Sequence, residues 1–343
     1  MLLSTSISSL IRSKGSKKSQ LVTLRSDATI RTALVTFIEQ DISAIPIRDG
    51  NLNGDAAFLG MLNVTDVLSY ILKDSPESFY KQDISTLLNR SLRVVMERCG
   101  IRKVKIIQDR ISLRSLLFNH WTNACPLDGK EIDTKHLIVN CGHGIYDVIT
   151  PTDFLRYSLL LSRESGYLRS TKASDIPCGF EIKDDSKVIH GEDDAWTAFN
   201  KLLETQPFYI LGVVNREFGT LEANLSAVDF LPSLASINSS GNSVSLEEAI
   251  SMLRRPGLSL YAFVRATRPI TVQRDLDPIV LQPHFTLADL IEKMAKMKIH
   301  QLWRVSHDRN RTPIGIVGIN DVNQYFCKIF EPFCNEATYH IEQ

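Results

Sequence analysis

The chain of 343 residues lacks long apolar runs, an excess of either charge and the dense cysteines of small secreted domains. Its longest apolar runs, such as residues 209–214, fall far short of the ~20 residues of a membrane helix, so a membrane-spanning protein is not expected. Lys and Arg number 39 and Asp and Glu also 39, which argues against a dedicated nucleic-acid binder. Six cysteines in so long a chain indicate a reducing compartment, and we expect a cytoplasmic location, with the nucleus as a second one.

Catalytic and metal motifs are also missing from the sequence. There is no P-loop, no G-x-S-x-G and no Rossmann glycine pattern. Cys125, His136, Cys141 and His143 lie close in sequence, but they lack the paired C-x₂₋₄-C spacing of a zinc site. We therefore expect no catalytic residues, no metal and no cofactor.

The amino terminus carries basic residues and serines but no acid. Arg12, Lys14, Lys17 and Lys18 within the first 20 residues give the bias of an organellar transit peptide. The alternative is a short solvated tail with a leading helix turn. We expect a flexible tail over residues 1–19 and a second tail over residues 333–343.

One sequence unit occurs four times. Each copy opens with a short β-branched strand, continues with an amphipathic helix and then has two apolar strands separated by a polar turn. In the first copy the helix carries the i, i+3, i+4, i+7 stripe of Ile30, Ala33, Leu34 and Phe37. Each copy closes with an acid that leads into a second helix; the four acids are Asp66, Asp153, Asp229 and Asp321.

The segments between the copies predict further elements. Residues 246–253 have the pattern of a helix, and residues 258–264 that of a strand, both between the third and fourth copies. Residues 83–105 form a basic connector between the first two copies, either as a solvated face or as a surface for an acidic partner.

The unit resembles the CBS motif, a β-α-β-β-α module of ~60 residues that pairs into Bateman modules. Residues 58–66, and residues 299–305 with 315–317, are similar to the first and last repeats of the gamma regulatory subunits of AMP-activated protein kinase. The resemblance implies an α/β fold with two Bateman modules, over residues 20–165 and 166–332, packed head to head as a flat disc. One repeat cannot bury both faces of its small sheet, so pairing is physically required.

The acid at each helix start can have two roles. A carboxylate there can accept hydrogen bonds from both hydroxyls of a ribose, and the helix N-terminus favours the following phosphate. The alternative is a helix capping box, which only stabilises the helix. The resemblance implies an adenine-nucleotide site, for which the candidate residues are Asp66, Thr150, Asp153, Ser226, Asp229, His300 and Asp321.

The phosphate side matches the family poorly. The resemblance places an Arg or a His-Arg pair at residues 43–44, 123–124, 208–209 and 300–301, where only His300 remains. Arg48, Arg268 and Arg304 are the alternative cations. We therefore expect fewer or weaker sites than in a typical gamma subunit, and the cleft between the third and fourth copies is the best candidate.

The predicted function is a non-enzymatic regulatory subunit. By resemblance, AMP, ADP or ATP would bind between repeats and alter contacts with the catalytic and scaffold subunits of a kinase. The alternative is a nucleotide-independent CBS scaffold or inhibitor that acts on a phosphatase or a stress-signalling partner. A homodimer also stays open.

Overall fold

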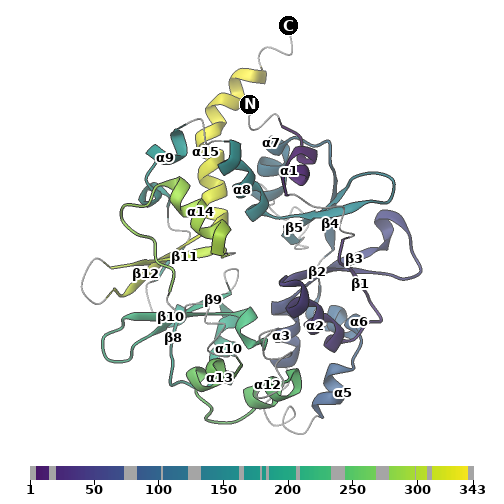
Figure 1. Cartoon of the computed structure of the whole chain (residues 1–343), viewed down its shortest axis with the longest axis vertical. Helices are drawn as coiled ribbons and strands as arrows, with labels where there is room; N and C mark the ends of the chain where they lie inside the picture. The colour runs from purple at the N-terminus through teal and green to yellow at the C-terminus, as the bar shows by residue number, and fades with distance from the viewer. Residues whose placement is uncertain are drawn as a thin grey trace.

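Four small three-stranded sheets and their helices make up the part of the chain that the structure describes (Figure 1). The computed structural model describes residues 5–14, 21–72, 83–101, 103–122, 133–161, 166–177, 180–182, 185–205, 209–232, 244–267, 278–297, 299–306 and 311–338. Residues 233–243 and 268–277, the second of which includes Arg268, lie outside these ranges, as does Cys125.

The four repeats and their connectors follow one another along the chain. Repeat 1 consists of β1 (Leu24–Arg25), α2 (Ile30–Gln40), β2 (Ala44–Arg48), η2 (Gly54–Ala57), β3 (Phe58–Asn63) and α3 (Val64–Leu72). Repeat 2 consists of β4 (Val104–Gln108), α7 (Leu113–Ser115), the π-helical η3 (Leu116–Thr122), β5 (Asp133–Asn140), β6 (Tyr146–Ile149) and α8 (Pro151–Leu161). Repeat 3 consists of β8 (Val188–His190), α10 (Ala195–Glu204), β9 (Ile210–Val214), β10 (Leu221–Ser226) and η7 (Ala227–Phe230). Repeat 4 consists of α14 (Leu287–Met297), β11 (Gln301–Val305), β12 (Pro313–Gly318) and α15 (Ile319–Thr338). The connecting elements are α1 (Ile7–Ser13), α5 (Ile84–Leu88), α6 (Leu92–Cys99), α9 (Tyr167–Ser170), η5 (Ala173–Asp175), β7 (Phe180–Glu181), η6 (Asp185–Lys187), α12 (Leu246–Leu253) and α13 (Leu260–Thr267).

The sheets confirm the predicted repeat, with one variation. In repeats 1, 2 and 3 the first strand is parallel to the second, and the second is antiparallel to the third. In repeat 4 the expected opening strand makes a single bridge, from Val280 to Trp303. There β7 pairs instead with the outer edge of β12, so a strand from the connector completes the sheet.

The sheets connect repeat 1 with repeat 2 and repeat 3 with repeat 4, whereas the helices connect repeat 1 with repeat 3 and repeat 2 with repeat 4. Between the sheets of repeats 1 and 2, the rings of Phe58 and Tyr146 lie 4.9 Å apart, edge to face. Between repeats 3 and 4, Trp303 Nε1 donates to Asn224 Oδ1 over 2.9 Å. The helices of repeats 1 and 3 share one apolar core, and those of repeats 2 and 4 share a second. The two modules therefore pack head to head in one layer (Figure 1), as expected.

A short helix is attached in the same way to each repeat. The residue that precedes α6, α1, α13 or η5 forms an antiparallel bridge with the residue that precedes the first helix of a repeat; the pairs are Ser91 with Thr29, Ser6 with Ser112, Ser259 with Asp194 and Lys172 with Thr286. Helix α6 is thus attached to repeat 1 and α13 to repeat 3, whereas α1, at the amino terminus, is attached to repeat 2. The chain shows an internal fourfold equivalence that extends beyond the sheets.

Three expectations about the segments outside the repeats are wrong. Residues Ile7–Ser13 are a helix and not a solvated tail, because Ile7 and Leu10 are fully buried in the core of repeats 2 and 4. The expected strand at residues 258–264 is helix α13, whose buried face follows the helical spacing of Leu260, Phe263 and Val264. Helix α15 continues to Thr338, beyond the expected end of the second module at residue 332.

Candidate functional site

The four aspartates singled out from the sequence lie at equivalent helix starts. In each of them Oδ2 accepts the backbone N–H of the residue three positions earlier, over 2.7 Å for Asp66, 2.9 Å for Asp153, 2.6 Å for Asp229 and 2.7 Å for Asp321. The hydroxyls of Thr150 and Ser226 donate to the same oxygens, over 2.9 Å and 3.0 Å. Each of the four aspartates therefore caps its helix. Any ligand that one of them binds would be bound in addition to this cap.

His300 lies beside the helix that carries Asp321. Its carbonyl oxygen accepts the N–H of Ile319, the first residue of α15, over 2.8 Å. The equivalent contact in repeat 1 joins Ser43 O and Val64 N over 3.0 Å. These two positions, where the resemblance implies phosphate-binding side chains, thus adjoin the helix starts. Those of repeat 2, and Phe208 of repeat 3, lie outside the described residues.

Repeat 3 contains a pocket with a volume of about 280 Å³. It lies between the edge strand β10 and helix α13, close to the lower end of the range of ~300–1,000 Å³ that is usual for small-molecule sites. The residues that line it are Val213, Glu222, Ala223, Asn224, Leu225, Asp229, Leu260, Tyr261, Val264 and Arg265. Of the predicted site residues, only Asp229 lines this pocket. Asn224, another lining residue, accepts a hydrogen bond from Trp303 of repeat 4.

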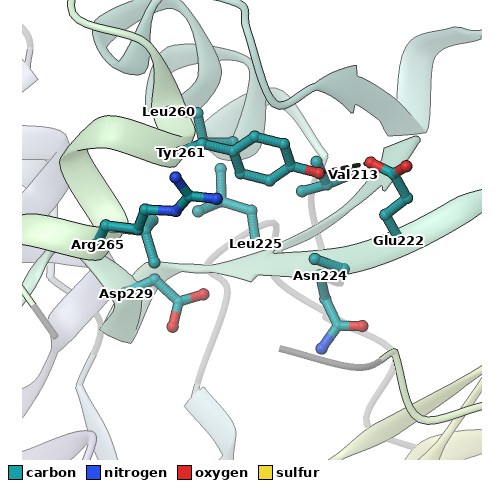
Figure 2. Close-up of a pocket in the computed structure, with 10 residues that line it drawn as sticks. Val213, Glu222, Asn224, Leu225, Asp229, Leu260, Tyr261 and Arg265 are labelled. Atoms are coloured by element: carbon teal, nitrogen blue, oxygen red, sulfur yellow. Dashed lines mark hydrogen bonds between the residues drawn. The ribbon is translucent and has the colours of Figure 1, made fainter. Parts of the chain in front are cut away.

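The two ends of the pocket carry different charged groups. Figure 2 shows Arg265 and Asp229 at one end and the pair of Tyr261 and Glu222 at the other. The Tyr261 hydroxyl donates to Glu222 Oε2 over 2.7 Å. Burial, followed by this hydrogen bond, strongly raises the pKa of Tyr261. Apolar side chains line the walls between the two ends, so the pocket suits a flat apolar ring with polar substituents.

Glycine at position 191 allows Tyr261 to take this place. A Cβ atom on Gly191 would lie 2.0 Å from Cε2 of the Tyr261 ring, which no real side chain permits. The N–H of Tyr261 also donates to Gly191 O over 3.0 Å. The wall of the pocket thus depends on a close contact between the start of α13 and the turn after β8.

The cations considered from the sequence have other contacts. Arg48 lies over the ring of Phe58, 5.2 Å from its centroid, between repeats 1 and 2. Arg304 donates to the carbonyl of Ser174 over 2.6 Å. Among the described residues that line the pocket, Arg265 is the cation.

Sequence reasoning missed Tyr261, Arg265 and Glu222 because residues 258–264 were expected to form a strand. The signal was available: Leu260, Phe263, Val264 and Thr267 repeat at i, i+3, i+4 and i+7, the spacing of an amphipathic helix. Recognition of α13 as a helix would still not have placed it against β10.

Two general features complete the description of the site. In the described parts of the chain, no three His, Cys, Asp or Glu side chains group as metal ligands would. The helices found in those same parts are all too short or too polar to cross a bilayer.

The repeated sheet-and-helix units, with an acid at each helix start and two modules side by side, define the CBS class of fold. The CBS domain model matches residues 17–73 and 272–328, so these two segments, in repeats 1 and 4, are CBS domains. These are the two copies in which the sequence resemblance was strongest.

One solved structure shares this fold over most of its length, and a second is similar at a lower score. A protein from Methanocaldococcus jannaschii, described as a proposed archaeal homologue of g-AMPK, is similar at a TM-score of 0.65 and 16% identity, over 92% of this chain and 99% of its own. A conserved protein of Pyrococcus horikoshii matches at a TM-score of 0.44 and 16% identity, over 89% of this chain and 95% of its own. No protein of curated function matches the sequence.

Proposed function

We propose that this protein is a non-enzymatic regulatory subunit that binds an adenine nucleotide in the pocket between β10 and α13. The observation that carries the proposal is the placement of Asp229 and Arg265 at one end of an apolar pocket in a CBS fold. Asp229 would accept hydrogen bonds from the ribose hydroxyls, Arg265 would bind the phosphate, and the base would lie between Val213 and Val264. Asp229 is the third of the four acids singled out from the sequence; Asp66, Thr150, Asp153, His300 and Asp321 stay candidate residues for further sites.

The arginine supplied by α13 answers the main objection raised by the sequence. A phosphate held without arginine loses charge-assisted hydrogen bonds worth roughly 1.5–3 kcal/mol each. Arg265 can provide such a bond although it lies far in sequence from residues 208–209, where the family resemblance places the cation. Exposed on the surface, it can also reach a phosphate at the mouth of the pocket.

Calorimetric titration with AMP, ADP and ATP tests this site. We expect Asp229→Asn to weaken AMP binding about 10–100-fold, because the amide keeps an acceptor for the Ser226 N–H but loses the charge on the diol. Arg265→Gln should weaken AMP binding to a similar degree, about 10–100-fold, and leave adenosine binding unchanged. Absence of heat with all three nucleotides at high protein concentration would sink the proposal.

Regulation of a kinase is the second part of the proposal. It is supported by the four-repeat fold shared with the proposed archaeal homologue of g-AMPK. A ligand can regulate a complex only through different affinities for two assembly states, typically about 1–3 kcal/mol apart. Purification of the protein from its native cells, with and without AMP, should recover kinase catalytic and scaffold subunits in different amounts. Recovery of no kinase would contradict this part and leave the ligand site intact.

A nucleotide-independent scaffold remains the second candidate. It is favoured by repeat 4, where β7 pairs along the edge of β12 that corresponds to the pocket edge of β10. In that case a phosphatase or stress-signalling protein would co-purify irrespective of nucleotide. The cytoplasmic or nuclear location and the homodimer stay predictions.

A further inference from the structure

Lys14, the C-cap residue that directly follows helix α1, lies at the helix start of repeat 2. Lys14 Nζ donates to the carbonyl oxygen of Val148 over 2.6 Å. The same nitrogen lies 3.4 Å from Asp147 Oδ1 and 3.6 Å from Asp153 Oδ2. The side chains of Lys14 and Asp153 are only 23% and 12% exposed, so water screens this ion pair partly. Three oxygen atoms thus surround one ammonium group, which has three protons to donate.

The same place in repeat 3 belongs to the open pocket. Asn224 and Asp229 have the spacing of Val148 and Asp153, and both line the pocket. In repeat 2 the Lys14 ammonium group lies near the Asp153 carboxylate and donates to the carbonyl oxygen of Val148. The equivalent position in repeat 3 is the one that a ligand of the pocket would occupy. The hydroxyls of a ribose are donors of the same kind.

The difference between the repeats comes from the attached helices. Helices α1 and α13 begin at equivalent bridges, at Ser6 and Ser259. Lys14 comes after Ser6 in the sequence by the same number of residues as Thr267 comes after Ser259. Thr267 is fully buried and donates to the carbonyl of Phe263 in its own helix over 3.1 Å. At this position a long cation reaches the carboxylate in repeat 2, whereas the short Thr267 side chain bonds within its own helix and does not line the pocket of repeat 3.

We propose that the Asp153 cleft of repeat 2 is a second site for a ribose-bearing ligand, held closed by Lys14 as an internal ligand. The identity of the ligand rests on the proposed function of the repeat 3 pocket. A nucleotide must displace the ammonium group before its hydroxyls can reach Asp153, which lowers the apparent affinity by the fraction of molecules in the open state. Release of the N-terminal helix by a partner would therefore add binding capacity.

The test is calorimetric titration of the full chain with AMP, with the number of sites as the readout. We expect Lys14→Ala to add one site per chain and the double variant Lys14→Ala/Asp153→Asn to lose it again. Arg12→Ala is the matched control, because it removes the same charge from the same segment, and the Arg12 guanidinium donates to Ser9 Oγ of its own helix, over 3.2 Å. Thermal unfolding of each variant shows whether α1 stays packed.

The outcomes separate this inference from the proposed function. An unchanged number of sites in Lys14→Ala, or an equal gain in Arg12→Ala, overturns the inference and leaves the repeat 3 pocket standing. Binding that occurs only in Lys14→Ala and requires Asp153 supports the inference and contradicts the proposed site at Asp229. No binding by either protein overturns both.

Discussion

Repeats 2 and 3 have the same chemistry at the helix start and different surroundings. Asp153 and Asp229 each accept a backbone N–H and a hydroxyl three residues earlier, from Thr150 and from Ser226. Yet the first carboxylate lies beside Lys14, and the second lines a pocket of about 280 Å³. The hydroxyl-x-x-Asp sequence therefore determines the cap, and the attached helix determines which groups lie beside the carboxylate.

The attached helix also comes from a different part of the chain in the two cases. Helix α13 directly follows repeat 3, whereas α1 lies at the amino terminus and crosses to repeat 2. The residues close to Asp153 in the sequence therefore do not indicate that Lys14 lies beside it. The surroundings of the two equivalent carboxylates are therefore set separately, by segments outside either motif.

Equivalent buried side chains anchor the two attached helices, so their truncation should have the largest effect. Phe263 on α13 and Leu10 on α1 follow their bridges by the same number of residues, and both are fully buried. We expect Phe263→Ala to lower the free energy of unfolding by about 3–5 kcal/mol and Leu10→Ala by about 2–5 kcal/mol, because each leaves a cavity. Urea denaturation measures both.

The control for these truncations is an exposed aromatic residue. Phe218 is 56% exposed, so Phe218→Ala should change stability by less than about 0.5 kcal/mol. A neutral Leu10→Ala would mean that α1 does not pack in solution, and the role of Lys14 would fall with it.

Much of this fold followed from periodicity. The stripe of Ile30, Ala33, Leu34 and Phe37 is buried as predicted, and helix α12 has the predicted bounds of Leu246–Leu253. Such patterns are local, since each depends on residues within one or two turns. The four acids were also found at helix starts, because the cap and the following apolar run are contiguous.

The pocket and the Lys14 contact could not be predicted in the same way. Both depend on where a helix docks, which is set by tertiary packing and not by its own sequence. Arg304 and Arg48 were reasonable cations by type, but they are engaged with η5 and with Phe58. A charge count cannot distinguish a side chain that faces a cleft from one that holds two segments together.

A substitution at Gly191, which contacts Tyr261, should have a smaller effect on stability and should affect only the pocket of repeat 3. Gly191→Ala should cost about 1–3 kcal/mol and displace the Tyr261 ring from the pocket wall, because the new Cβ atom overlaps the ring. We expect nucleotide binding at repeat 3 to weaken and any site at Asp153 to be unaffected. Denaturation and calorimetry on the same sample measure the two effects.

A double-mutant cycle isolates the cause of that loss. If the ring is responsible, Gly191→Ala should cost little stability in a Tyr261→Ala background. An equal cost in both backgrounds would place the strain in the backbone of the turn and contradict the steric account.

The smallest expected effect is a dependence of stability on alkaline pH. The pKa of Tyr261 is raised by burial and by its hydrogen bond to Glu222, so the folded protein keeps the phenol protonated at pH values where the unfolded chain, with a pKa of ~10, has lost the proton. The stabilisation is complete below about pH 10 and is lost as the pH rises above it. Tyr261→Phe should therefore flatten the fall of stability on the alkaline side.

Tyr146 of repeat 2 supplies the matched comparison. Its hydroxyl donates to Asp55 Oδ1 over 2.8 Å, and burial and this bond raise its pKa in the same direction. The shift is larger for Tyr261, so we expect Tyr261→Phe to flatten the curve more than Tyr146→Phe does. Chemical denaturation between pH 8 and about pH 11 measures both slopes. Equal slopes in the two variants would show that the wall of the open pocket is no drier than the exposed surface between repeats 1 and 2, and the pocket would then be a poor place for a nucleotide base.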